Sequence, residues 1–170
     1  MAFRQEIAEI EPSKLVFVDE SGIDNNEAYQ YGWALRGERL FGLKPGKRTT
    51  RFSIIGALNQ STFFAPFVFE GHCDLAVFLT YLENVLIPML TPGQYVILDN
   101  VSFHKNPKVR ALIEDAGCYV KYLPPYSPDL NLIEHWWHSL KTNLRKALSF
   151  FNFDLYKAVD LVFDYFGKPC

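Results

Sequence analysis

The stretch LPPYSPDLNLIEHWW, Leu123–Trp137, joins a proline-rich loop to a helix-forming run. Its prolines fix φ and stiffen the loop. Asn131 is a good N-cap residue, and Glu134 follows it at the spacing of a capping box. Two roles are therefore open for Glu134: a helix cap, or a catalytic carboxylate held in place by a rigid loop.

The run after this loop predicts an amphipathic helix from Leu132 to about Leu148. Its apolar residues recur at helical spacing and form one buried stripe, which consists of Ile133, Trp137, Leu140, Leu144 and Leu148. The neighbouring face carries Glu134, His138, Lys141 and Arg145. A carboxylate followed by bases suits a metal with an adjacent phosphate, but it equally suits a solvated face with i, i+4 pairs. We expect Trp136 and Trp137 to pack in the core rather than to stack on bases.

Composition narrows the class of protein. The chain has 170 residues, of which 49% are hydrophobic and 16% aromatic, and this indicates one folded globular domain. A net charge of −2 gives no global attraction for nucleic acid. The three scattered cysteines indicate reduced cytosolic thiols. The most apolar helical stretch is about 16 residues long, against roughly 20 for a membrane span, so we expect a cytoplasmic protein with no membrane partner.

The order of predicted elements indicates a mixed α/β sheet. Hairpin-connected strands come first, at Lys14–Ser21, Tyr31–Gly37, Arg51–Asn59 and Thr62–Gly71, the last with Pro66 indicating an edge or a bulge. Strands at Tyr95–Asn100 and Cys118–Pro124 then alternate with helices from Asp74 to about Leu90, at Asn106–Gly117, from Leu132 and at Phe153–Tyr165. This order predicts a sheet that is antiparallel on one side and parallel on the other, with helices on its faces.

Two apolar strands end in aspartate, LVFVD at Asp19 and YVILD at Asp99. Ligand sites of open α/β sheets lie at the carboxyl ends of parallel strands. A single aspartate there would simply start a turn, but two of them favour a shared site. Glu20 should point to the opposite face of its strand, so we place it outside this site.

Asp19, Asp99 and Glu134 at one sheet edge would repel one another unless a cation neutralises them. Mg²⁺ or Mn²⁺ prefers such oxygen ligands. Two such ions can activate a nucleophile and stabilise the leaving oxygen in phosphodiester displacement. His135 and His138 with Cys73 do not form a recognisable zinc set.

The segments VFVDESG, VILDNVSFHK and LPPYSPDLNLIEHWWHSLK, in this order, resemble the DDE endonuclease domain of mariner-type transposases and their bacterial insertion-sequence relatives. Thirty-four residues, Asn100–Ile133, separate Asp99 from Glu134, which matches the D-x34-E spacing of that superfamily. The resemblance covers roughly Lys14 to Leu148. Leu132 stands where relatives commonly have proline.

The resemblance implies a ribonuclease H-like fold in which Asp19, Asp99 and Glu134 bind Mg²⁺ or Mn²⁺ as two ions. The implied activity is metal-dependent cleavage of DNA at transposon ends with water as nucleophile, followed by attack of the freed 3′-hydroxyl on target DNA. Asn100 and Asn131 are expected to lie next to the metal-binding carboxylates and to orient them without contacting the metal. His104 is expected either to orient ligands or to contact phosphate, with a structural or surface position as the alternative.

A local basic run, Arg36 to Arg51, suits phosphate contact despite the overall charge, and an exposed hairpin connection is the alternative. The predicted DNA contacts are Lys44, Lys47, Arg48, Arg51, His104, Lys105, His138 and Lys141. We expect an N-terminal helical remnant (1–13), a catalytic domain (14–150) and a C-terminal helix packed on it (151–170).

Relatives implied by the resemblance carry N-terminal helix-turn-helix domains, for which there is no room before Lys14. We therefore consider a separate chain with that domain, and a homodimer by analogy, as partners beside DNA. One alternative function is a catalytically silent remnant or regulatory subunit that binds DNA or full-length transposase. Another is a Holliday-junction resolvase, which fits the acids but not the proline-rich loop.

Overall fold

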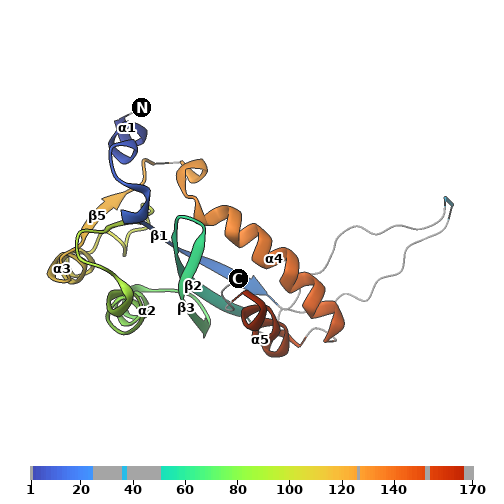
Figure 1. The fold of residues 1–170 in the computed structure, drawn as a ribbon. Helices are drawn as coiled ribbons and strands as arrows, with labels where there is room; N and C mark the ends of the chain where they lie inside the picture. The colour runs from blue at the N-terminus through green and yellow to red at the C-terminus, as the bar shows by residue number, and fades with distance from the viewer. Residues whose placement is uncertain (1, 25–35, 38–50, 126, 152–153, 167–170) are drawn as a thin grey trace.

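A five-stranded sheet in the order β3-β2-β1-β4-β5 forms the centre of the computed structural model, which describes residues 2–24, 36–37, 51–125, 127–151 and 154–166 (Figure 1). The strands are β1 (Leu15–Asp24), β2 (Arg51–Asn59), β3 (Thr62–Glu70), β4 (Tyr95–Leu98) and β5 (Tyr119–Tyr122). β1 pairs antiparallel with β2 and parallel with β4, while β2 and β3 are antiparallel and β4 and β5 parallel. The predicted mixed sheet is confirmed.

Helices cover both faces of the sheet. The helices are α1 (Ala2–Ala8), α2 (Leu75–Tyr81), α3 (Pro107–Asp115), α4 (Ile133–Phe150) and α5 (Leu155–Phe166). Figure 1 shows α2 and α3 on one side of the sheet and α4 and α5 on the other. Each side encloses its own layer of buried apolar side chains. None of the described helices is long and apolar enough to span a membrane.

The side chains of β1 alternate between the two apolar layers. Leu15 and Phe17 pack with the residues of α4 and α5, whereas Val16 and Val18 pack with those of α2 and α3. This alternation follows from the two-residue repeat of a strand. It also determines the sides on which the two acids that follow, Asp19 and Glu20, are placed.

The hairpin of β2 and β3 contains the irregularity that Pro66 indicated. β3 is an edge strand among the described strands, and its register with β2 shifts between Ile55 and Ala57. A Cβ built on Gly56 would lie 2.2 Å from the ring of Phe63. Glycine therefore leaves room for this ring, which stacks on Trp136 of α4 with ring centroids 3.4 Å apart.

The helix predicted from Asp74 to about Leu90 is only partly α-helical. Asp74 caps α2 by accepting a hydrogen bond from the Val77 backbone N–H at 2.9 Å. After Tyr81 the chain forms a π-helical turn, Leu82–Leu86, and then a short 3₁₀ helix, Ile87–Met89. Pro88 accounts for the change, because it has no N–H and its ring clashes with the carbonyl four residues earlier in an α-helix.

The other predicted helices lie close to their expected bounds. Asn106 caps α3 by accepting a hydrogen bond from the Lys108 N–H at 3.0 Å, and Pro107 occupies the first helical position. α5 corresponds to the helix predicted at Phe153–Tyr165. The predicted strand Tyr31–Gly37 lies outside the described residues except for 36–37, which form a turn.

Candidate active site

The three predicted carboxylates line one cleft of about 330 Å³. Asp19 and Asp99 each lie two residues beyond the parallel pair Phe17 and Ile97 of β1 and β4, so the sheet places them at the same edge. Glu134 enters from the first turn of α4. The cleft is also lined by Asn100, Val101, Leu123, Pro124, Ser127 and Asn131.

Asp19 is the buried member of the three, with 7% of the residue exposed. Its Oδ2 accepts hydrogen bonds from Asn131 Nδ2 and Trp137 Nε1, each at 3.2 Å, and its Oδ1 accepts one from the Glu20 N–H at 2.9 Å. Burial, with the negative charges of Glu20, Glu134 and Asp99, raises the pKa of Asp19 to about 7. In the described part of the chain, the charged neighbours that shift this pKa are all acids.

Asp99 is more open to the cleft, and its side chain is 34% exposed. Its Oδ1 accepts a hydrogen bond from the Val101 N–H at 3.0 Å and lies 2.6 Å from His104 Nδ1. Burial alone would raise the pKa of Asp99, but these hydrogen bonds, with the charges of His104 and Lys105, outweigh it and lower the pKa. Two carboxylates of one cleft thus have pKa values shifted in opposite directions.

His104 lies behind Asp99 and is fully buried. Its Nε2 is 2.8 Å from Oε1 of Glu20, and its backbone carbonyl accepts a hydrogen bond from Tyr122 Oη at 3.0 Å. Burial opposes protonation, but the hydrogen bonds to Asp99 and Glu20 and their charges raise the pKa of His104 to about 9. Of the roles considered for this residue, burial favours orientation of a carboxylate over contact with a DNA phosphate.

The prediction that Asn131 is the N-cap of α4 is wrong. Leu132 occupies the cap position, without a side-chain hydrogen bond, and Asn131 Nδ2 donates to Asp19. An N-cap side chain would accept a backbone N–H through its oxygen. Asn131 Oδ1 is buried and has no hydrogen-bond partner among the described residues. The backbone carbonyl of Asn131 accepts a hydrogen bond from the Glu134 N–H at 3.1 Å, and this bond connects the loop to the first helical turn.

Two further residues shape the cleft. The Asn100 side-chain amide donates to the Leu123 carbonyl and thereby ties the end of β4 to the end of β5. Trp137 was predicted only as core packing; it is 3% exposed, and it also donates to Asp19. A signal for this role was present in the sequence, because a buried indole N–H requires an acceptor.

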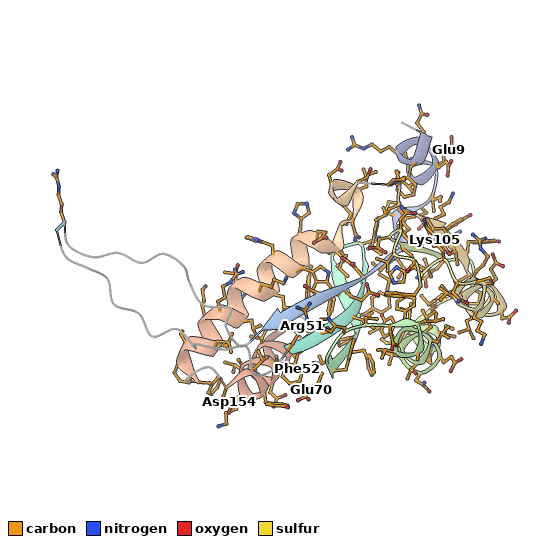
Figure 2. All side chains as sticks on the ribbon, turned by 180° about the vertical axis from the view of Figure 1, so that it is seen from behind. Glu9, Arg51, Phe52, Glu70, Lys105 and Asp154 are labelled. Atoms are coloured by element: carbon orange, nitrogen blue, oxygen red, sulfur yellow. The ribbon has the colours of Figure 1, made fainter. Side chains whose placement is uncertain are left out.

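The described residues among the predicted DNA contacts come from three parts of the fold: the start of β2, the loop before α3, and α4. Lys105 and His138 are exposed and Lys141 is half-buried, whereas Lys44, Lys47 and Arg48 lie outside the described residues. Figure 2 shows Arg51 and Lys105 in separate parts of the molecule. Lys141 and His138 share α4 with Glu134, so these two predicted contacts lie on the helix that enters the cleft.

The cleft has the donor chemistry for a hard divalent cation. Among the described residues that line it, the ionisable groups are all carboxyl groups, and Asn131 Oδ1, which has no hydrogen-bond partner among them, adds a neutral oxygen. Among the described residues, however, no three His, Cys, Asp or Glu side chains are grouped closely enough to hold one ion. The residue types fit Mg²⁺ or Mn²⁺.

The fold belongs to the ribonuclease H-like class of transposase catalytic domains. The chain matches the structure described as the Mos1 strand transfer complex with a TM-score of 0.76 and 19% identity, over 99% of this chain and 51% of that one. The model of the family described as DDE superfamily endonuclease matches residues 14–155. The chain belongs to this family, as its motifs predicted.

Two other similar proteins support the assignment. The insertion element IS630 uncharacterized 39 kDa protein of Shigella sonnei is 26% identical over 132 residues, which make up 76% of this chain and 38% of that protein. The Mos1 mariner paired end complex with Mn has a TM-score of 0.64 and 17% identity, over 82% of this chain and 44% of that one. The chain thus spans about half or less of the length of these relatives.

Proposed function

We propose that the chain is the catalytic domain of a DDE-type transposase that cleaves DNA phosphodiesters at transposon ends and joins the freed 3′-hydroxyl to target DNA. The observation that supports this most is the single cleft lined by Asp19, Asp99 and Glu134. The family membership supplies the reaction class. The Mos1 structures, described as a strand transfer complex and a paired end complex with Mn, suggest DNA and a divalent ion as its partners.

Asp19, Asp99 and Glu134 would hold Mg²⁺ or Mn²⁺, as two ions in the reaction proposed. A bound divalent ion supplies activation of water and stabilisation of the leaving oxygen. Asp19 gives a buried, doubly supported carboxylate, Asp99 gives a partly exposed one, and Glu134 completes the set from α4. Asn131 and Trp137 orient Asp19, and Asn100 fixes the cleft wall.

The DNA would lie along α4 beyond Glu134, where His138 and Lys141 are available for phosphate contacts. Lys105 lies next to His104, on the Asp99 side of the cleft, and its charge acts on Asp99. Lys44, Lys47, Arg48 and Arg51 remain proposed contacts. A homodimer, and a separate chain with a helix-turn-helix domain, are proposed partners for a cytoplasmic, nucleoid-associated reaction.

A supercoiled plasmid incubated with the purified chain and Mn²⁺ tests the activity. We expect nicking that EDTA abolishes and that Asp99→Ala reduces by at least about 100-fold, since a metal-ligand carboxylate would be lost. Asp160→Asn, an exposed acid of α5, is the matched control and should nick like the wild type. Equal nicking by the wild type and Asp99→Ala would refute the assigned carboxylates.

The alternative function is a silent remnant or regulatory subunit that binds DNA or full-length transposase. Under this alternative the wild type would bind plasmid DNA in a filter-binding assay without nicking it in Mn²⁺. Under the proposed function, nicking accompanies binding.

A further inference from the structure

The imidazole of His104 occupies a closed position behind the cleft. It is fully buried and packs against the rings of Phe78 of α2 and Phe103, with ring centroids 4.3 Å and 4.6 Å away. Both ring nitrogens contact carboxylates, Nδ1 to Asp99 at 2.6 Å and Nε2 to Glu20 at 2.8 Å. The ring therefore has two polar constraints and two packing constraints, and these define one orientation.

Glu20 reaches this ring from the side of the sheet away from Asp19. The Asp19 carboxylate meets Trp137 of α4, whereas the neighbouring Glu20 meets His104 and, at 3.8 Å, the Cys73 thiol. Its side chain is 16% exposed, and it is not one of the described residues that line the cleft. The Glu20 backbone N–H donates to Asp19 Oδ1, whereas the Glu20 carboxylate is linked by hydrogen bonds through His104 to Asp99.

The two oxygens of Asp99 are used unequally. Oδ1 receives the contacts of both the Val101 N–H and His104 Nδ1. Oδ2 has no hydrogen-bond partner among the described residues, although Asp99 lines the cleft and is 34% exposed. One oxygen is anchored to the protein, and the other is left for a ligand.

We propose that Glu20 and His104 are a positioning pair that holds Asp99 by Oδ1 so that Oδ2 is presented to a divalent cation. This inference rests on the proposed function, since it assigns a second layer of contacts to the same metal site. A ligand held in place before the cation arrives loses less conformational freedom on binding, and outer contacts of this type commonly contribute 10–100-fold to metal affinity. Glu20 would act only through the ring and would not touch the cation.

The affinity of the full chain for Mn²⁺ tests the pair without DNA or turnover, by electron paramagnetic resonance of the free ion. We expect His104→Leu, which removes the donor and keeps an apolar side chain against Phe78 and Phe103, to weaken Mn²⁺ binding by about 10-fold or more. His104→Asn retains a donor near the position of Nδ1 and should stay within about 3-fold of the wild type. Cys73→Ala is the matched control, because it removes the other contact of Glu20 and leaves the ring in place.

A double-mutant cycle then separates a route through the ring from a general effect on folding. Glu20→Ala should weaken Mn²⁺ binding several-fold in the wild-type background and have no further effect in the His104→Leu background. An equal effect of Glu20→Ala in both backgrounds, or wild-type affinity in His104→Leu, would overturn the proposal. If His104→Leu fails to fold, as judged by circular dichroism, Glu20→Ala alone decides: a several-fold loss supports the pair, and wild-type affinity refutes it.

If the proposed metal site does not exist, the Mn²⁺ affinities of the variants will follow a different pattern. A wild-type chain that binds no Mn²⁺, or binds it as tightly after Asp99→Ala, would refute the metal site itself and the positioning pair with it. A wild type that binds Mn²⁺ through Asp99, with His104→Leu and Glu20→Ala unchanged, would refute only the pair.

Discussion

Trp137 Nε1 donates a hydrogen bond to Asp19 Oδ2 over 3.2 Å and so connects helix α4 to strand β1 inside the protein. Asn131 donates to the same oxygen from the loop before the helix. Glu134 lies between these two residues in the sequence. The two donors therefore hold the segment that carries Glu134 against the strand that carries Asp19, and the geometry of the cleft depends on both.

Replacing the indole tests this connection. Trp137→Phe removes the N–H donor but keeps an aromatic ring in the core, and we expect it to lower the free energy of unfolding by about 1–2 kcal/mol at pH 9. The loss should be smaller at pH 5, where Asp19 is protonated and needs the donor less. Urea denaturation at both pH values measures the difference. Trp136→Phe is the control: it weakens the stacking on Phe63, and its cost should not depend on pH.

Asp19 should make the unfolding free energy depend on pH. Its pKa is raised from 3.8 to about 7 in the folded chain, so the folded state holds the proton more tightly than the unfolded state. The contribution of Asp19 to stability is therefore largest below pH about 4 and declines until pH about 7.

Asp19→Asn does not titrate and should remove this decline. In EDTA, we expect the variant to gain stability relative to the wild type between about pH 4 and 7, by a total on the order of 2–4 kcal/mol, since a tenfold change in acid dissociation is worth about 1.4 kcal/mol. Thermal melts across this range measure it, with the exposed Asp160→Asn as the control. A difference between Asp19→Asn and the wild type that stays constant with pH would contradict the raised pKa.

Glu134 should matter for the reaction but little for folding. Glu134 is exposed, and no side chain caps the N-terminus of α4. Glu134→Gln should therefore change the thermal midpoint by less than about 2 °C. Under the proposed function, plasmid nicking in Mn²⁺ should fall by at least about 100-fold, because the amide cannot replace a carboxylate toward the metal. A large loss of stability would show instead that Glu134 is mainly a helix-capping residue.

The bases of α4 should contribute to DNA affinity without specificity. The double variant His138→Ala, Lys141→Ala should weaken binding of a duplex several-fold and reduce the dependence of log affinity on log salt by about 1, because one or two phosphate contacts are lost. Lys157→Ala on α5, whose ammonium pairs with Asp154 at 3.1 Å, is the matched control. An unchanged salt dependence in the double variant would remove this face of α4 from the DNA-binding surface.

Gly56 allows the close contact between the β2–β3 hairpin and α4. Gly56→Ala would place a methyl group against the ring of Phe63, and we expect a loss of about 1–3 kcal/mol in unfolding free energy. The loss should shrink in a Phe63→Leu background, where the side chain can move away. Urea denaturation of the four proteins gives the comparison, and an undiminished loss would place the cost of the alanine elsewhere in the strand.

Much of this fold was predictable because local signals and tertiary needs coincide. Asn106 and Pro107 start α3 as expected, and Ile133 and Trp137 fall on the buried side of α4. The two aspartates at strand ends were enough to place Asp19 and Asp99 at one edge. Patterns of this kind survive folding because burial reinforces them.

The failures have both tertiary and local causes. Asn131 has the character of a cap, but its side chain is directed to the buried carboxylate of Asp19 and not to the helix end. Pro88 is a local signal that is visible in the sequence, yet the chain forms a π-helical turn before it rather than a simple end to the helix. The contact between Glu20 and His104 joins residues 84 positions apart, so no local pattern could reveal it.

The pleat of β1 places two consecutive carboxylates, Asp19 and Glu20, in different environments. Because they diverge onto opposite faces, a one-residue slip of this strand would exchange them. Glu20 would then meet Trp137, and Asp19 would be enclosed with Phe78 and Tyr81. Each acid would lose its own donors, and a longer side chain would occupy the cleft. Strand registry at the centre of the sheet is therefore as much a requirement for the chemistry as the identity of the acids, and single-residue insertions or deletions in Val16–Asp19 should be tolerated less than substitutions there.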